Sequence, residues 1–265
     1  MTRKLALITG ASAGIGAAFA RVYAEAGYDL ALTARRADRL DILAKELRAA
    51  HGVEVLTLTA DLADPGAPGV LIAAIEGRGR HVDVLINNAG YGLPGAYAKT
   101  TWAQQQAFIQ VLVTAVCALN HGVLPGMMAR GYGRIVNVAS LAGLVPGMPS
   151  HTMYGPAKSF LVKFSQGLHQ ETLGTGVHVC ALRPGLTESE FHDVNGTRPK
   201  MGAIPRMMWQ DADTVAREGL AAVEANRAVH ITGWPNRLIA VLAKLLPDAL
   251  LMAMTARAAR RLRDM

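Results

Sequence analysis

Short apolar runs alternate with longer stretches that carry apolar residues at helical spacing, and this alternation extends through most of the chain. Strands that alternate with helices form parallel βαβ units with right-handed crossovers. We therefore expect an α/β fold with a doubly wound parallel sheet and helices on both faces. Strands are predicted at residues 5–8, 30–33, 53–58, 84–86, 134–138 and 178–182, and helices at 14–26, 37–50, 66–76, 101–130, 154–172, 214–226 and 237–254.

Length and composition favour a single packed domain. The chain has 265 residues, of which 51% are hydrophobic and 18% charged, which is far from a disordered profile and typical of a sheet buried on both faces. No repeat, low-complexity tract or linker marks a boundary. We expect one domain over residues 1–265, in which the part from about residue 186 onward forms a substrate lid and C-terminal helices.

The charge pattern and the cysteines exclude several classes of protein. The net charge is +7, with 16 basic and 14 acidic residues at 1–197 against 11 and 6 at 198–265. No basic run is interleaved with aromatic residues and no helix-turn-helix spacing is present, so we expect no nucleic-acid partner. Cys117 and Cys180 stand far apart, and no histidines have metal-ligand spacing, which indicates a reducing, metal-free setting.

No segment has the pattern of a signal peptide or a transmembrane helix. The apolar run at 5–8 ends at Gly10 and joins a glycine-rich loop, so we interpret it as the first strand. A transmembrane helix needs ~18 apolar residues. The nearest candidate, 238–254, is interrupted by Lys244, Pro247 and Asp248. We expect a soluble, cytoplasmic protein.

A glycine-rich loop follows the first predicted strand directly and opens a helix. Its sequence is Thr9-Gly10-Ala11-Ser12-Ala13-Gly14-Ile15-Gly16. Glycines permit a tight turn and a close backbone approach to a pyrophosphate, whose charge the free N–H groups of a helix N-terminus stabilise. A strand-to-helix turn without a ligand also uses glycine, so the loop alone does not establish a dinucleotide site.

The end of the second predicted strand indicates which dinucleotide binds. The segment Thr33-Ala34-Arg35-Arg36 has no carboxylate. NAD enzymes usually place an acidic residue here for the ribose 2′-hydroxyl, whereas an arginine accommodates the 2′-phosphate of NADP. With Ala34 at the acidic position, Arg35 as the phosphate ligand and Arg36 as a second partner, we expect NADP(H) to be preferred over NAD(H). The alternative is that both arginines are ordinary exposed residues at the start of a helix.

Tyr154 and Lys158 lie four residues apart and so on one helix face. Hydride transfer needs a group that moves a proton at the substrate oxygen, and a phenol serves if a nearby ammonium lowers its pKa from ~10. Ser140 stands at the C-terminal end of a predicted strand, where α/β sheets bind ligands, and its hydroxyl is placed to hold a carbonyl oxygen. A Tyr and a Lys four apart also occur by chance, so the prediction depends on Ser140 and the glycine loop as well.

Taken in order, these motifs resemble the short-chain dehydrogenase/reductase family. The loop has the family's Thr-Gly-x-x-x-Gly-Ile-Gly pattern, Asn87-Asn88-Ala89-Gly90 its Asn-Asn-Ala-Gly, and residues 154–158 its Tyr-x-x-x-Lys. Two further segments match the family: Ala60-Asp61-Leu62, and Arg183-Pro184-Gly185 with Thr187 and Ser189. Together the motifs span residues 9–189.

The resemblance implies a Rossmann-type fold and an NADP-dependent oxidoreductase that acts on CH–OH groups. It makes Ser140, Tyr154 and Lys158 the catalytic residues and implies that Lys158 also holds the nicotinamide ribose. It further implies a homodimer or homotetramer formed through the helices at 101–130 and 154–172. The predicted cofactor-binding residues are Gly10, Ser12, Gly14, Ile15, Gly16, Arg35, Arg36, Asp61, Leu62, Asn88, Ala89, Gly90, Tyr154, Lys158, Pro184, Gly185 and Thr187.

Two positions depart from the family pattern. Leu112 stands where the family usually has an Asn that keeps a helix kink and relays water to the lysine. A leucine holds no water by hydrogen bonding, and Gln110 points to nearly the opposite side of a helix. The 14 residues from Ser140 to Tyr154, where 13 are common, indicate a one-residue insertion around 146–149. Slow or rerouted proton supply is predicted, and the alternative function is an NADP(H)-binding regulatory or scaffold protein with weak turnover.

The part after residue 185 bears on substrate and partners. An apolar, flexible set of side chains predicts a hydrophobic alcohol and its ketone or aldehyde as substrate, although such residues also pack a lid onto the body. The tail at 238–263 ends in several arginines; it is either a core or dimer helix with a solvated basic end or a weak peripheral contact with an anionic membrane. The apolar set is Phe191, Met201, Ile204, Met207, Met208 and Trp209, and the arginines are Arg257, Arg260, Arg261 and Arg263.

Overall fold

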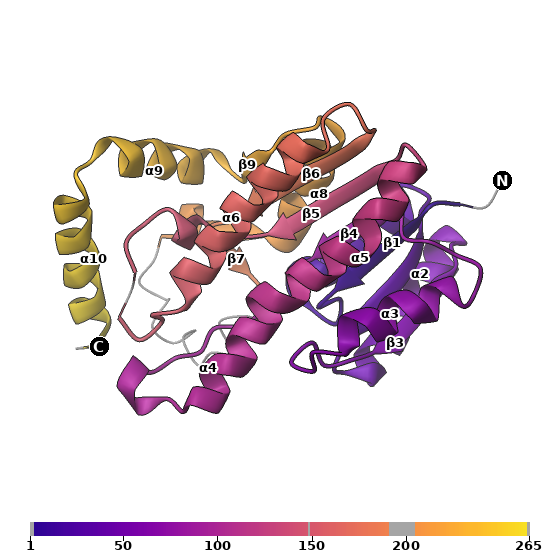
Figure 1. The fold of residues 1–265 in the computed structure, drawn as a ribbon. Helices are drawn as coiled ribbons and strands as arrows, with labels where there is room; N and C mark the ends of the chain where they lie inside the picture. Colours follow the sequence, from indigo (N-terminus) through magenta and orange to yellow (C-terminus); the bar gives the residue numbers. More distant parts are fainter. Residues whose placement is uncertain (1–2, 148, 191–204, 264–265) are drawn as a thin grey trace.

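The centre of the fold is a sheet of seven strands in the order β3-β2-β1-β4-β5-β6-β9. The computed structural model describes residues 3–147, 149–190 and 205–263. Neighbouring strands are parallel throughout, so their carboxyl ends lie along one edge (Figure 1). The strands are β1 (Leu5–Thr9), β2 (Asp29–Ala34), β3 (Val55–Thr59), β4 (Val84–Asn87), β5 (Gly133–Val138), β6 (Val177–Arg183) and β9 (Val229–Ile231).

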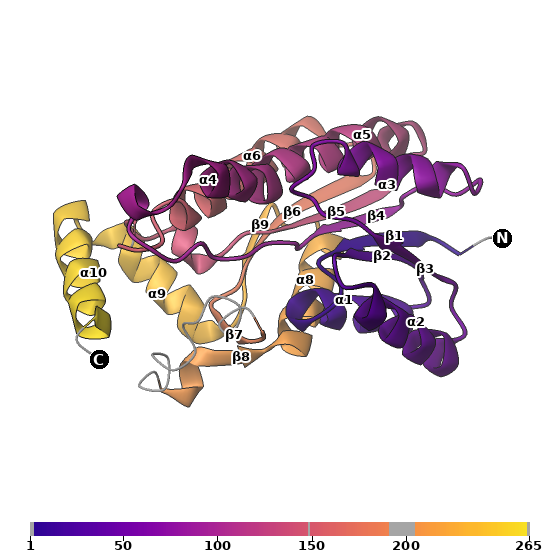
Figure 2. The ribbon, with the colours of Figure 1, turned by 90° about the horizontal axis from the view of Figure 1, so that it is seen from below.

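Helices cover both faces of the sheet, as the alternating pattern predicts. The helices α3 (Ala67–Glu76), α4 (Trp102–Ile109), α5 (Ala115–Ala129) and α6 (Tyr154–Glu171) lie on one face, and α1 (Gly14–Glu25), α2 (Ala37–His51) and α8 (Ala212–Glu224) on the other (Figure 2). The predicted doubly wound α/β fold and its six predicted strands are confirmed. The strand β9 was not predicted, because three residues are too few to show a periodicity.

The core consists of two apolar layers, one on each side of the sheet. Along β1, Ile8 packs toward α1 and α8, and its neighbour Leu7 packs toward α3 and α5. Ile86 and Leu85 repeat this alternation on β4. Because both faces are covered, the strands are continuously apolar instead of alternating apolar and polar residues. The two layers hold the strands in place, and the functional site lies at the carboxyl ends of these strands.

The predicted helix at 101–130 is correct in extent but is not one regular α-helix. A capping box between Thr101 and Gln104 begins it, and a π-helical turn, η2 (Gln110–Thr114), separates α4 from α5. Such turns insert one residue into the helical ladder and often mark functional positions. Leu112 lies in the middle of this turn. The irregularity that the family pattern associates with Asn is therefore present with a leucine.

The predicted helix at 237–254 is wrong as a single element. The chain instead forms α9 (Trp234–Leu245) and α10 (Asp248–Arg263). Leu246 between them is extended, with φ −85° and ψ 142°, because the ring of Pro247 disfavours helical backbone in the preceding residue. These two helices lie away from the central sheet (Figure 1).

Part of the segment after β6 is paired rather than irregular. The short strand β7 (Leu186–Glu188) pairs in parallel with β8 (Trp209–Asp211). The remaining short turns are η1 (Tyr97–Lys99), η3 (Leu141–Gly143) and η5 (Arg206–Met208). The pairing holds residues 186–188 close to the carboxyl edge of β6, where they contribute to the site.

The packing of α8 on α1 leads to a stability prediction. A Cβ at Gly219 would lie 2.7 Å from Cζ of Phe19, which is fully buried. Gly219→Ala is therefore expected to lower the free energy of unfolding by about 1–3 kcal/mol through overpacking. The matched control is Gly69→Ala, because Gly69 lies on exposed backbone of α3 and no atom is near the new methyl group. This control should raise the free energy of unfolding by up to about 1 kcal/mol. Urea unfolding measures both, and equal changes in the two variants would contradict the packing argument.

Candidate active site

A cavity of about 840 Å³ opens at the carboxyl edge of the sheet. It brings together residues from the ends of β1, β2, β4, β5 and β6 and from α6. Every predicted site residue except Gly16 lines it. The lining residues predicted from sequence are Gly10, Ser12, Gly14, Ile15, Arg35, Arg36, Asp61, Leu62, Asn88, Ala89, Gly90, Ser140, Tyr154, Lys158, Pro184, Gly185 and Thr187.

Gly16 serves the glycine loop through packing instead of lining the cavity. A Cβ at Gly16 would lie 2.2 Å from the carbonyl oxygen of Gly10 and 2.6 Å from Nδ2 of Asn88. Only glycine permits α1 to begin this close to the end of β1. The Asn88 side chain in turn donates to the Thr9 carbonyl oxygen at 3.0 Å. Gly16 therefore holds the loop in place, and its predicted contact with the cofactor stays a prediction.

Thr9 is a residue that sequence reasoning missed. Its buried hydroxyl accepts hydrogen bonds from the backbone N–H groups of Asn88 and Ala89, both at 3.0 Å. It thereby ties the end of β1 to the turn after β4. Its place in the loop motif was visible in the sequence, but its partners lie about 80 residues further along the chain.

The two arginines after β2 occupy different positions at the cavity. Arg36 is half-buried, and its Nε and Nη2 donate to Oγ of Ser12 at 3.3 and 3.0 Å. Arg35 is exposed, and its charge opposes the rise that burial causes in the pKa of Tyr91. Tyr91 lines the cavity with its ring edge-on to Phe108, and no sequence motif had pointed to it.

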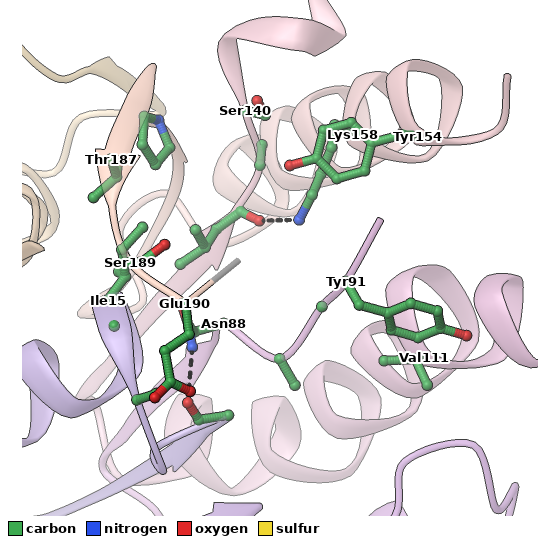
Figure 3. A pocket seen from close by; sticks show the side chains of 18 of the residues that line it. Ile15, Asn88, Tyr91, Val111, Ser140, Tyr154, Lys158, Thr187, Ser189 and Glu190 are labelled. Atoms are coloured by element: carbon green, nitrogen blue, oxygen red, sulfur yellow. Dashed lines mark hydrogen bonds between the residues drawn. The ribbon is translucent and has the colours of Figure 1, made fainter. Parts of the chain in front are cut away.

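Ser140, Tyr154 and Lys158 lie together on the opposite wall (Figure 3). Burial raises the pKa of Tyr154 to about 12, and a hydrogen bond with the Ser140 side chain opposes this rise. Lys158 is buried; its Nζ donates to the Val138 carbonyl oxygen at 2.7 Å and lies 5.8 Å from the centre of the Tyr154 ring. Burial, and not the Lys158 charge, thus dominates the pKa of Tyr154 in this structure, contrary to the sequence-based expectation of a lowered value.

Leu112 is buried directly beneath the catalytic wall. It is 1% exposed and packs with Phe108 and Ala157. A Cβ at Gly90 would lie 3.8 Å from Cγ of Leu112 and 3.7 Å from Nζ of Lys158, so the leucine side chain and the ammonium both lie next to Gly90. From this helix Ala107 and Val111, and not Gln110, line the cavity. Leu112 thus contributes hydrocarbon to this wall, and its replacement of the family's Asn stays a prediction.

The substrate end of the cavity differs from the predicted set. It is lined by Leu141, Val145, Pro146, His151 and Leu186, mostly from the loop that sequence reasoning treated only as an insertion. Burial lowers the pKa of His151, which favours its neutral form. The predicted residues Met207, Met208 and Trp209 do not line the cavity, and Phe191, Met201 and Ile204 lie outside the described residues.

The fold and the site define an α/β oxidoreductase that binds a dinucleotide at a glycine loop. The model of the short-chain dehydrogenase family matches residues 4–199. The chain belongs to this family, and the resemblance inferred from the motifs is confirmed.

The relatives and solved structures include an NADP-dependent enzyme and NADPH complexes. The chain is 39% identical to sulfoacetaldehyde reductase of Chromohalobacter salexigens over 186 residues, 69% of this chain and 72% of that protein. It is 36% identical to the NADP-dependent 3-hydroxy acid dehydrogenase of Salmonella typhi over 72% and 75% of the two chains. A short-chain dehydrogenase from Sphingobium yanoikuyae in complex with NADPH matches with a TM-score of 0.80, 33% identity and coverage of 90% and 91%. These likenesses support NADP(H) as the preferred cofactor.

The buried ammonium leads to a prediction about stability and pH. Burial lowers the pKa of Lys158 to about 8, below the ~10.5 of an unfolded lysine. Below pH 8 the folded protein carries the full desolvation penalty of a charge; as pH rises toward 10.5, the folded state loses the proton first and the penalty disappears. Lys158→Met should therefore raise the free energy of unfolding at pH 7 by on the order of 2 kcal/mol, and this gain should shrink by pH 10.

Urea unfolding at pH 7 and pH 10 measures the gain. The control is Lys163→Met on the exposed face of α6, for which we expect no such change with pH. A gain for Lys158→Met that stays constant between the two pH values would contradict the prediction.

Proposed function

We propose that this protein is an NADP(H)-dependent dehydrogenase/reductase of the CH–OH class that interconverts an apolar alcohol and its ketone or aldehyde. The observation that supports this most directly is the pairing of Tyr154 and Ser140 by a hydrogen bond at the wall of the cavity that the glycine loop also lines. The role of each site residue below is part of the proposal.

The residues at the other wall fit a dinucleotide phosphate. The N-terminus of α1 lines the cavity through Gly14 and Ile15, and the first turn of this helix has no acidic residue to repel an anion. The unpaired N–H groups and dipole of a helix N-terminus favour phosphate. Arg35 and Arg36 add positive charge on the same side. When bound there, NADPH supplies the hydride.

Tyr154 and Ser140 handle the substrate oxygen. Their hydroxyl groups are placed to hold a carbonyl oxygen in common, and Tyr154 donates the proton as the oxygen gains negative charge. A pKa of about 12 keeps Tyr154 protonated at pH 7, the form that carbonyl reduction requires. Oxidation of the alcohol uses the same groups in reverse and needs the phenolate form of Tyr154. The rate of oxidation therefore increases as pH rises. Lys158, held by the Val138 carbonyl, supplies positive charge below the ring.

The lining favours an uncharged, apolar substrate. Among the described residues at the substrate end, His151 is the one basic side chain, and its lowered pKa favours the neutral form. Leu141, Val145, Pro146 and Leu186 supply apolar surface. A sulfonate or carboxylate would require a cation that this wall does not provide. We therefore propose that this chain differs in substrate from its relatives that act on acids.

The first functional prediction concerns the proton donor. Tyr154→Phe should reduce the rate of NADPH-dependent ketone reduction by about 10²–10⁴-fold, because the general acid is lost, while NADPH affinity stays within a few-fold. The loss of NADPH absorbance with a panel of apolar ketones measures the rate. Tyr91→Phe, at the same cavity but away from Ser140, is the matched control and should keep most of the activity.

Two outcomes would contradict the proposal. Full activity of the Tyr154→Phe variant would refute the assigned mechanism. A native protein that reduces sulfoacetaldehyde or 3-oxo acids faster than every apolar ketone would refute the substrate class and leave the mechanism intact.

The second candidate is an NADP(H)-binding regulatory or scaffold protein with weak turnover. Leu112 favours it, since a buried leucine beside Lys158 provides no group to pass a proton from solvent. In this case the cofactor site would be intact and the chemical step slow.

Replacing Leu112 separates the two candidates. We expect Leu112→Asn to raise turnover by about tenfold if proton supply limits the native protein, with unchanged NADPH affinity, whereas the apolar control Leu112→Met should change neither. Steady-state kinetics and NADPH fluorescence titration measure both quantities. A native turnover number already in the usual enzyme range of ~1–10³ per second would reject the scaffold role.

Assembly and location follow as further proposals. Within the described residues, Trp102–Ala129 is the one helix long and apolar enough to cross a membrane, but 44% of its most apolar window is buried in the fold. Trp102 and Phe160 are exposed on this side, which supports a homodimer or homotetramer through α4, α5 and α6.

Exposed apolar residues on α9, such as Leu238 and Val241, suit either a partner copy or a weak membrane contact. A cytoplasmic location and a single domain stay predictions.

A further inference from the structure

A carboxylate sits on the arginines beside the glycine loop. Nη1 of Arg36 donates to Oε2 of Glu190 at 2.9 Å, and the other oxygen of Glu190 accepts from Arg39. The same Arg36 guanidinium bonds Ser12 through Nε and Nη2. Glu190, Arg36 and Ser12 all line the cavity. One guanidinium thus connects the loop after β1, the start of α2 and the chain just beyond β7.

The backbone next to Glu190 packs tightly on the glycine loop. A Cβ at Gly14 would lie 2.9 Å from Cβ of Ser189, so residues 189 and 190 lie against the beginning of α1. Figure 3 shows Ser189 and Glu190 beside Ile15 and Asn88, on the wall opposite Tyr154 and Lys158. This packing places the backbone that carries Glu190 beside the glycine loop, and the carboxylate reaches the arginines from there.

In the proposed cofactor site, the 2′-phosphate of NADP uses one of the same arginines, Arg36. An arginine at this point accommodates that phosphate, and the phosphate carries more negative charge than the carboxylate and has three acceptor oxygens. A phosphate next to an ionised Glu190 would be repelled, and the Arg36 guanidinium already bonds Ser12 through Nε and Nη2 and Glu190 through Nη1.

We propose that Glu190 is a selectivity residue: its carboxylate occupies the 2′-phosphate position in the free protein and has to leave Arg36 and Arg39 when NADP(H) binds. The inference rests on the proposed cofactor site. Its consequence is a lower affinity for NADP(H) than the arginines alone would give.

The Glu190 carboxylate has a different effect on the binding of NADH. NADH has a hydroxyl where NADPH has the phosphate, and a carboxylate near this point accepts a hydrogen bond from the 2′-hydroxyl in NAD-binding sites. Position 34 supplies no such group, since it is Ala34. Glu190 reaches the same region from a distant part of the chain. Glu190 therefore weakens the binding of NADPH and leaves the binding of NADH unchanged or strengthens it.

Glu190→Gln tests this with both cofactors. The variant keeps the shape of the side chain, and the two ion pairs are about 40% exposed, so the fold should be retained and the effect moderate. We expect the Kd of NADPH to fall by about 3–10-fold and the Kd of NADH to stay the same or rise. Fluorescence titration measures both constants. Glu188→Gln is the matched control, because Glu188 is exposed, lies two residues away and does not line the cavity.

Three results would overturn the inference: an unchanged NADPH Kd in Glu190→Gln, an equal change for NADPH and NADH, or the same change in Glu188→Gln. Each of these leaves the proposed function standing if the native protein binds NADPH and reduces ketones. A native protein that binds neither cofactor would instead refute the proposed function. Ultracentrifugation and circular dichroism of the variants confirm that the fold is unchanged.

Discussion

The hydrogen bonds between Thr9 and the turn after β4 are the junction on which the site depends. In the strand order β3-β2-β1-β4-β5-β6-β9 the chain reverses its direction of progress between β1 and β4, and ligands bind at such a switch point. The Thr9 hydroxyl and the Asn88 amide join the two strand ends there. Gly16 lets α1 begin against this junction, so the cavity, the helix N-terminus and the catalytic wall share one rigid edge.

Removal from water determines the chemistry on the catalytic wall. Burial moves the pKa of Tyr154 to about 12 and that of Lys158 to about 8, so each shift favours the neutral form. A neutral phenol suits proton donation to a ketone, and the lysine charge is maintained at neutral pH at a cost in stability. Leu112 adds hydrocarbon to the buried cluster that Tyr154 packs against. In the proposed mechanism, the same burial that adjusts the acid also restricts its resupply with protons.

Both the cofactor wall and the substrate wall lie within the part of the chain that the family model matches. The family match ends at residue 199 and includes the glycine loop, the Tyr154–Lys158 helix and Ser140. The apolar side chains from the loop after β5 determine what fits beside Tyr154. Glu190 lies at the other end, where a carboxylate from beyond β7 contacts arginines from α2. The substrate and cofactor specificities that we propose thus rest on residues outside the motifs.

The sequence by itself determined the α/β class, six strands, the glycine loop and the motif residues that line the cavity, because these follow from local periodicity and from motifs of short spacing. It did not show β9, the π turn around Leu112, the break at Pro247, or the roles of Thr9, Tyr91 and Glu190. Those depend on contacts between residues far apart in the chain, as in the pairing of Glu190 with Arg36 across 154 positions. The protonation of Tyr154 also needed the structure, since a pKa depends on which atoms exclude water around the group, and only the folded chain decides that.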